Sequence, residues 1–271
     1  MKKEEIINKI IKDIKSVKIQ GATNIAKSAL YAYSLSKTKK TKNKLINARP
    51  TEPLLINILK KFDEGMTKKE ILNHFIETQN KINNFVFKLI KDGDIIMTHC
   101  HSTSVVQALI YCKKKGKKFQ VYNTETRPLY QGRKTSKELS KVGIKVTMFI
   151  DSAINIALEK KQGTKKVNKV FLGADAILDN FVINKVGSEV ISKLAFYNKI
   201  PVYLLADSWK YYPKKIKIEE RNINEIWNNA PKNVKIRNPA FEIVNKKYIK
   251  AIISEYGILS YDKFLKKVKN K

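Results

Sequence analysis

The spacing of apolar residues divides the chain into two parts. In the first part, isoleucine, leucine and alanine recur every three or four positions among lysine and glutamate, as in helices that bury one face. This period predicts amphipathic helices over residues 3–17, 22–36, 52–63 and 67–91. The lysine-rich segment 37–48 interrupts the pattern, and its neighbouring like charges indicate a solvated loop.

After Asp92-Gly93, short apolar runs alternate with helix-like stretches. The runs predict strands near 94–98, 118–123, 145–150, 167–172, 201–205 and 249–254. The stretches predict helices near 103–115, 134–142, 152–161, 185–198 and 259–269. Such alternation favours right-handed crossovers and a mostly parallel sheet with helices on both faces. We therefore predict an α/β fold, with an N-terminal helical domain (1–91) followed by a Rossmann-like domain (92–271).

Composition narrows the classes of protein. The chain has 271 residues, 43% of them hydrophobic, which is enough for a sizeable core. Its apolar runs are shorter than the roughly 20 residues that span a bilayer, and its N-terminus has the period of a helix rather than of a signal peptide. With only Cys100 and Cys112, a disulfide scaffold is not expected. We expect a cytoplasmic protein with no membrane partner.

The formal net charge of +31 at pH 7 raises the question of nucleic-acid binding. The lysines are spread along the chain rather than gathered in one patch, so we do not expect nucleic acid as a partner. Arginine is rare, and the planar guanidinium binds phosphates and carboxylates in a way that lysine does not. The few arginines are therefore informative. They are Arg49, Arg127, Arg133, Arg221 and Arg237.

Cys100 follows the predicted strand 94–98 and precedes a predicted helix. Reactive groups in open α/β sheets lie at this carboxyl edge of the strands. Backbone N–H groups of such a turn lower the pKa of a thiol, although a lone cysteine is more often a small buried hydrophobe. Ser102 and the hydroxyls after it are consistent with a helix cap and a small anion site. Alternation along a strand makes His99-Cys100-His101 a poor metal site, and we expect no metal.

Asp175 follows Gly173-Ala174 and the predicted strand 167–172, so it is expected at the same edge. A helix cap or a loop carboxylate is the alternative for this residue. Asn184 and Lys185 come nine residues later, at the predicted start of the next helix. An amide and a cation there can recognise sugar hydroxyls and a phosphate.

The segment 124–133 is unusually rich in polar and planar groups for a connection between a strand and a helix. Pro128 and Gly132 restrict this loop and would hold Gln131 and the arginines in place. For Glu125 and Arg127, direct contact with a ligand and an ion pair that braces the loop are equally good interpretations.

Two N-terminal pieces complete the candidate site. Gln20, Gly21 and Ala22 open a predicted helix and could present backbone amides to a phosphate. Arg49 precedes another helix and could clamp an oxyanion. For either piece, the alternative is a helix cap and nothing more. Lys210 belongs to the same expected set of substrate-binding residues.

Several of these motifs together resemble a known family, from about Ile19 to nearly the C-terminus. The chain resembles the sugar-1-phosphate aldose–ketose isomerases, a superfamily that also contains the regulatory subunits of translation initiation factor two-B. Within it, the motifs are most similar to those of the archaeal ribose 1,5-bisphosphate isomerases. The matching segments are Thr-His-Cys-x-Ser at 98–102, Glu-Thr-Arg-Pro-x-x-Gln-Gly at 125–132, Gly-Ala-Asp at 173–175, Asn-Lys-x-Gly at 184–187, Arg-Asn-Pro-Ala-Phe at 237–241 and Glu-Tyr-Gly at 255–257.

The resemblance implies that Cys100 and Asp175 are the catalytic pair, with no metal and no organic cofactor. Asp175 would protonate the ring oxygen, its pKa raised by apolar surroundings such as Phe171 and Phe181, and Cys100 would move hydrogen from C2 to C1. The implied substrate is ribose 1,5-bisphosphate and the implied product ribulose 1,5-bisphosphate. The resemblance also implies a homo-oligomer, a dimer or a trimer of dimers, and leaves a nucleotide activator open.

Two other functions share this fold. One is a non-catalytic regulatory subunit like those of initiation factor two-B, which typically lacks the cysteine. The other is a methylthioribose-1-phosphate isomerase, which usually has glycine where Ser102 stands. The chain departs from the isomerase pattern at Phe181, which follows Asn180 in place of glycine, and at Gln20, which replaces arginine.

Overall fold

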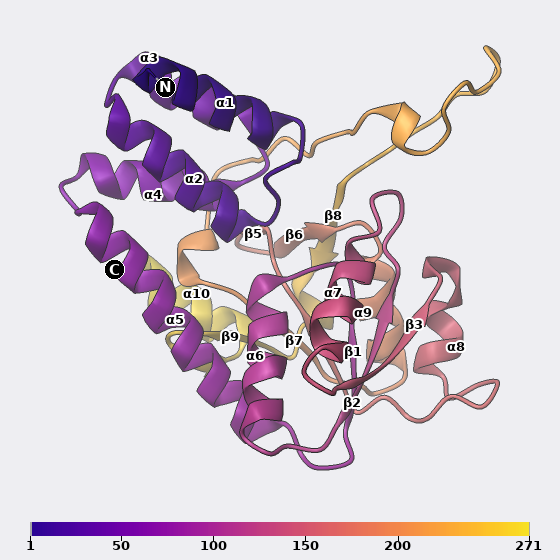
Figure 1. Ribbon diagram of the computed structural model, residues 1–271. Helices are drawn as coiled ribbons and strands as arrows, with labels where there is room; N and C mark the ends of the chain where they lie inside the picture. Colours follow the sequence, from indigo (N-terminus) through magenta and orange to yellow (C-terminus); the bar gives the residue numbers. More distant parts are fainter. Residues whose placement is uncertain (1, 271) are drawn as a thin grey trace.

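The structure, a computed structural model, describes residues 2–270 (Figure 1). Helices make up the N-terminal part and pack around two apolar clusters of their own. They are α1 (Lys3–Lys15), α2 (Ala22–Leu35), α3 (Lys39–Ala48), α4 (Pro53–Asp63) and α5 (Lys68–Leu89). Four of them correspond to predicted helices, and α3 is an addition to the prediction.

The lysine-rich segment 37–48 is a helix for most of its length, so the prediction of a solvated loop was wrong. Thr38 caps the helix by accepting a hydrogen bond from the Thr41 backbone N–H at 3.2 Å. Thr41, Leu45 and Ala48 are buried and lie on one helical face, while the lysines occupy the remainder. The abundance of lysine hid this narrow apolar stripe.

A seven-stranded sheet forms the centre of the second part, in the order β10-β9-β7-β4-β1-β2-β3. All neighbouring strands are parallel except β10, which is antiparallel to β9. The strands are β1 (Ile95–Thr98), β2 (Gln120–Thr124), β3 (Lys145–Phe149), β4 (Lys169–Leu172), β7 (Val202–Leu205), β9 (Ala251–Ser254) and β10 (Gly257–Leu259). The predicted α/β class with a mostly parallel sheet is confirmed.

Helices cover both faces of this sheet, because successive strand residues point to opposite sides. Ile96 and Phe171 pack with α5 and α6 (Thr103–Lys114) on one face. Met97 and Leu172 pack on the other face against three further helices. These are α8 (Ile154–Leu158), α9 (Ser188–Tyr197) and α10 (Tyr261–Lys269). Helix α7 (Gln131–Ser140) follows β2.

A second, three-stranded antiparallel sheet was not predicted. It has the order β5-β6-β8 and comprises β5 (Ala176–Ile177), β6 (Phe181–Lys185) and β8 (Phe241–Asn245). The predicted helix 185–198 therefore begins later, at Ser188, after Gly187 adopts a φ of 103°. Val182 and Ile183 are buried in two different clusters, so β6 lacks the alternation of a one-sided strand.

The connection between β7 and β8 runs along the N-terminal helices and then projects outward before it returns (orange in Figure 1). It contains short 3-10 turns at Ser208–Lys210 and Ile223–Glu225, with two more elsewhere at Asp151–Ala153 and Lys246–Tyr248. The division of the chain at residue 91 stays a prediction. Helix α5 contributes Ile71 to one of the two helical clusters and Val86 to the cluster on one face of the main sheet. Within residues 2–270, no helix combines the length and apolarity needed to span a bilayer.

Candidate active site

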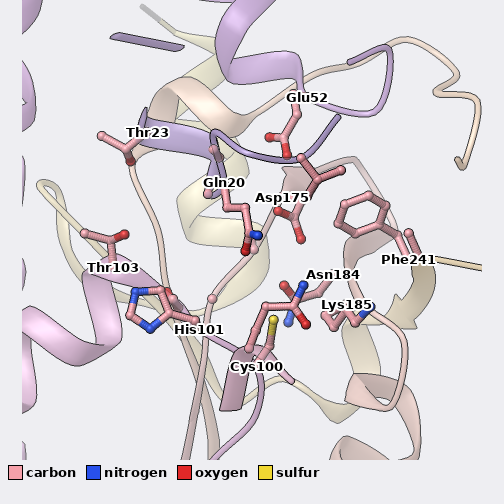
Figure 2. A pocket seen from close by; sticks show the side chains of 18 of the residues that line it. Gln20, Thr23, Glu52, Cys100, His101, Thr103, Asp175, Asn184, Lys185 and Phe241 are labelled. Carbon is pink, nitrogen blue, oxygen red and sulfur yellow. The ribbon is translucent and has the colours of Figure 1, made fainter. Parts of the chain in front are cut away.

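A pocket lies at the carboxyl edge of the sheet, between the strand ends and the N-terminal helices (Figure 2). Its position follows from topology, because the strand order reverses between β1 and β4, and ligands bind at such switch points. All the residues expected to form the site line this one pocket. They are Cys100 and Asp175, together with Gln20, Gly21, Ala22, Arg49, Gln131, Asn184, Lys185 and Lys210. Their individual roles stay predictions.

Cys100 lies directly after β1 in a left-handed conformation, with a φ of 64°. Its backbone N–H donates to the Thr126 hydroxyl at 3.0 Å, and its carbonyl accepts from the Thr135 hydroxyl at 2.8 Å. A non-glycine residue in this conformation is strained, so the two contacts are needed to fix the direction of the thiol.

The environment of the Cys100 thiol differs from the expectation. Burial raises the pKa of Cys100 to about 11, and Lys185 and a backbone N–H counteract the shift only in part. The expectation that the turn lowers this pKa was wrong, because the loss of water outweighs the backbone dipoles. The thiol therefore holds its proton at neutral pH.

The two histidines beside Cys100 have separate structural partners. His99 is buried, donates from Nε2 to the Val186 carbonyl at 2.8 Å and contacts the Thr124 hydroxyl through Nδ1. Burial lowers the pKa of His99 to about 4, so the imidazole is neutral. His101 contacts the Thr135 hydroxyl through Nδ1 at 3.1 Å. His99 thus ties β1 to the turn after β6 and does not face the pocket with a free nitrogen.

Asp175 follows β4, and its backbone N–H donates to the Ile183 carbonyl at 2.9 Å. Gly173 brings this turn close to that of Cys100: a Cβ at Gly173 would lie 2.6 Å from the Ser102 Oγ. Figure 2 places the Asp175 carboxyl above the Cys100 thiol, with Asn184 and Lys185 between and beside them. The two candidate catalytic groups therefore share one pocket.

Burial raises the pKa of Asp175, and the cations Lys210, Arg49 and Lys185 oppose the shift. The predicted direction is confirmed, but the predicted neighbours are not those of the pocket. Phe171 packs in the core under α5 and α6, and the aromatic residue that lines the pocket is Phe241.

Asn184 and Lys185 are the last residues of β6, not the first of a helix. This corrects the prediction that they open the helix after them. The Asn184 amide donates to the Ser188 hydroxyl at 2.9 Å, and the Lys185 side chain is buried. Being on a strand gives both side chains a fixed register opposite β8.

Arg49 and Lys210 are buried cations with partners inside the protein. Arg49 lies 3.5 Å from both oxygens of Glu219, which also pairs with Arg221 at 2.9 Å. Lys210 donates to the Ala174 carbonyl at 2.5 Å. Neither cation is the free clamp that the sequence indicated for Arg49, because each is already oriented by an acceptor.

The loop before α7 directs Gln131 into the pocket. A Cβ at Gly132 would lie only 1.8 Å from the Thr124 carbonyl oxygen, so this position requires glycine. The Gln131 Oε1 atom is buried with no protein partner, which leaves it available to a ligand. Glu125 pairs with Arg133 at 3.0 Å rather than with Arg127, so the proposed ion pair had the wrong partner.

Sequence reasoning missed several residues of the pocket, namely Glu52, Arg221, Glu225 and Phe241. The rarity of arginine in this chain could have identified Arg221 as a candidate for the site. Glu52 stands three residues after Arg49 and directly before Pro53, a position that marks a helix start and nothing more. Its place in the pocket depends on tertiary packing.

Comparisons with known proteins agree with this geometry. Residues 6–261 match the model of the initiation factor 2 subunit family. A ribose 1,5-bisphosphate isomerase of Methanocaldococcus jannaschii is 34% identical over 96% of this chain and 93% of its own. A methylthioribose-1-phosphate isomerase of Thermosipho melanesiensis is 33% identical over 94% of this chain and 87% of its own. A translation initiation factor eIF-2B structure from Pyrococcus horikoshii superposes with a TM-score of 0.81 at 26% identity, over 94% of this chain and 96% of that one.

Proposed function

Because the chain belongs to the initiation factor 2 subunit family, we propose that it is an aldose–ketose isomerase of sugar phosphates whose substrate is ribose 1,5-bisphosphate. The observation that carries the proposal is the meeting of Cys100 and Asp175 in one pocket at the switch point of the sheet. Relatives that bear the names of sugar-phosphate isomerases cover nearly the whole chain and support the same reaction class.

The pocket suits a small molecule with strong negative charge. Lys185, Lys210 and Arg49 line it, and the N-terminus of α2 opens into it at Gly21 without a side-chain cap. Uncapped N–H groups at a helix start bind phosphate well. These groups would hold the two phosphates, and Gln131 and Asn184 would contact the sugar hydroxyls.

The first chemical step opens the sugar ring. Asp175 donates its proton to the ring oxygen, and the bond between this oxygen and C1 breaks. The raised pKa of Asp175 suits this role, since a general acid must hold its proton until the substrate is bound. Binding of the phosphates positions the ring oxygen against the acid.

The second step moves hydrogen between carbons. The Asp175 carboxylate that ring opening leaves takes the proton of the Cys100 thiol, and the resulting thiolate takes the proton from C2, which gives an enol at C1 and C2. The thiol formed in this way returns the proton to C1. The C2 hydroxyl then gives its proton to the Cys100 thiolate, which leaves the ketone and restores both the Cys100 thiol and the Asp175 acid. Lys185 favours the thiolate that this step needs, against the effect of burial on the pKa of Cys100.

A coupled assay with the purified protein tests the proposal. Ribose 1,5-bisphosphate and methylthioribose 1-phosphate are supplied separately, and formation of the corresponding ketose is measured. Turnover of the first supports the proposal, and preference for the second identifies a methylthioribose-1-phosphate isomerase instead. Binding of either sugar phosphate without turnover would favour a regulatory subunit.

We further propose that the chain forms a homo-oligomer, a dimer or a trimer of dimers. Helix α9 exposes three large apolar side chains, with Val190 49%, Phe196 51% and Tyr197 74% accessible. Exposed apolar residues gathered on one element are typical of an interface. Light scattering of the purified protein measures the mass, and a monomer at micromolar concentration would contradict the proposal.

A further inference from the structure

Glu52 is a buried acid that the proposed reaction leaves without a role. It directly precedes α4, and only 1% of its surface is accessible. Its carboxyl group lines the pocket on the side of Asp175 (Figure 2). Its Oε2 atom is buried and has no hydrogen-bond partner in the protein. A buried polar atom without a partner is costly, which makes it a candidate for contact with a ligand.

The charges that face Glu52 do not neutralise it. The Arg49 guanidinium lies 4.0 Å from Oε1 but is shared with Glu219, and the Lys210 ammonium donates to a carbonyl. Asp175 and Glu219 add negative charge nearby. Burial, with Asp175 as the second cause, raises the pKa of Glu52 to about 8. At neutral pH the group is therefore a carboxylic acid, an O–H donor that faces the pocket.

We propose that protonated Glu52 donates a hydrogen bond to the phosphate of the substrate that Arg49 binds. The inference rests on the proposed function, since it takes a sugar phosphate as the ligand. A neutral acid donates to a phosphate oxygen, whereas a carboxylate has no proton to donate and repels the anion. Glu52 thus acts as a binding residue whose protonation makes the affinity for the phosphate depend on pH.

The pH dependence of binding has a definite sign. The proton must be present on Glu52 for tight binding, so affinity is highest below pH 8 and falls as the acid ionises above its pKa of about 8. Each pH unit well above this pKa should weaken binding roughly tenfold. Asp175 lines the same pocket and its pKa is also raised by burial, so the effect of Glu52 is read as the difference between the wild type and its variants.

The experiment measures binding of ribulose 1,5-bisphosphate, the proposed product, by calorimetry from about pH 6.5 to 9.5. Glu52→Gln keeps an N–H donor at every pH, so we expect a much smaller loss of affinity above pH 8. Glu52→Ala removes the donor and should weaken binding about tenfold or more at neutral pH. Glu64→Gln is the matched control, an exposed acid at the other end of α4, and should retain the wild-type pH profile.

Two outcomes would overturn the inference: affinity of the wild type that does not change above pH 8, or the same alkaline loss in Glu52→Gln as in the wild type. Infrared spectra of the wild type add a test without any substitution, since the band of a protonated carboxyl must disappear as pH rises through 8. The inference would also be overturned if no protonated-carboxyl band remained above pH 7 to be lost as pH rises through 8.

The same data separate this inference from the proposed function. Pronounced pH-dependent binding without turnover contradicts only the isomerase activity. Turnover, together with an affinity whose pH dependence is the same in the wild type and in Glu52→Gln, contradicts only the inference. A protein that binds no sugar phosphate at any pH contradicts both.

Discussion

The two sides of the pocket are constructed differently. On one side, which we call the sheet wall, Cys100 and Asp175 follow paired strands, and hydrogen bonds hold their backbones. On the other side, the helical wall, Arg49 and Glu52 stand between α3 and α4 and interact with each other and with Glu219 through side chains. Strand register fixes position more firmly than ion pairs do. The sheet wall is therefore suited to chemistry, and the helical wall to binding that can be tuned.

The largest effect is expected on the sheet wall. Cys100→Ser or Asp175→Asn should reduce turnover about a thousandfold or more, because each removes a group that transfers a proton in the reaction. The coupled isomerase assay measures the loss, and thermal unfolding verifies the fold. Cys112→Ser is the control, since Cys112 is buried within α6 and away from the pocket, and it should retain turnover. Near-normal rates in either catalytic variant would refute the assigned roles.

The sheet wall could be predicted from sequence because its signals are local. An apolar run followed by Thr-His-Cys or Gly-Ala-Asp marks the end of a strand, and parallel strand ends meet at one edge. The sequence prediction failed at β6, a short strand of five residues that begins at Phe181 and is buried on both faces. Because this strand lacks an alternating pattern, the sequence places Asn184 and Lys185 at the start of the following helix instead. The fold class was still predicted correctly, because six apolar runs indicated strands of the main sheet.

The helical wall was harder to predict because its signals are not local. The stripe of Thr41, Leu45 and Ala48 is narrow among lysines, so α3 was missed. Glu52 resembles an ordinary residue before a helix. Its environment depends on Glu219, which lies in the long connection between β7 and β8. No spacing along the chain indicates that contact.

Glu52 on the helical wall should also make the free energy of unfolding depend on pH. A pKa of Glu52 raised from 4.5 to about 8 means that the folded state holds the proton more tightly than the unfolded state. This contribution to stability is complete below pH 4.5 and falls, by up to about 1.4 kcal/mol per pH unit, as pH rises to about 8.

Glu52→Gln removes the ionising group, so the variant should gain stability over the wild type as pH rises through this range. Urea unfolding at about pH 5 and 8.5 measures the difference. We expect the gain at the higher pH to exceed that at the lower by about 2 kcal/mol or more. Glu64→Gln, an exposed substitution on the same helix, should give no such gain. Equal gains at both pH values would mean that folding does not change the pKa of Glu52, and would contradict the prediction.

A smaller effect is expected from Arg49→Lys, which keeps the charge of the helical wall but loses the planar fork. We expect KM for ribose 1,5-bisphosphate to rise about tenfold, with a much smaller change in kcat, because phosphate binding and not proton transfer is impaired. Steady-state kinetics separate the two constants. A loss confined to kcat would instead assign Arg49 to the chemistry and erase the distinction between the walls.

The smallest expected effect concerns the support of the helical wall. Thr38 caps α3, the helix that Arg49 directly follows, and Thr38→Ala removes the acceptor for the Thr41 N–H. Loss of such a cap costs about 1 kcal/mol of folding stability. Because α3 positions Arg49, KM should rise slightly while kcat stays near that of the wild type. Lys40→Ala, at an exposed position in the same helix, should change unfolding by less than about 0.5 kcal/mol. If Thr38→Ala lowered kcat as strongly as KM rose, the helical wall would be coupled to the chemistry on the sheet wall rather than to binding alone.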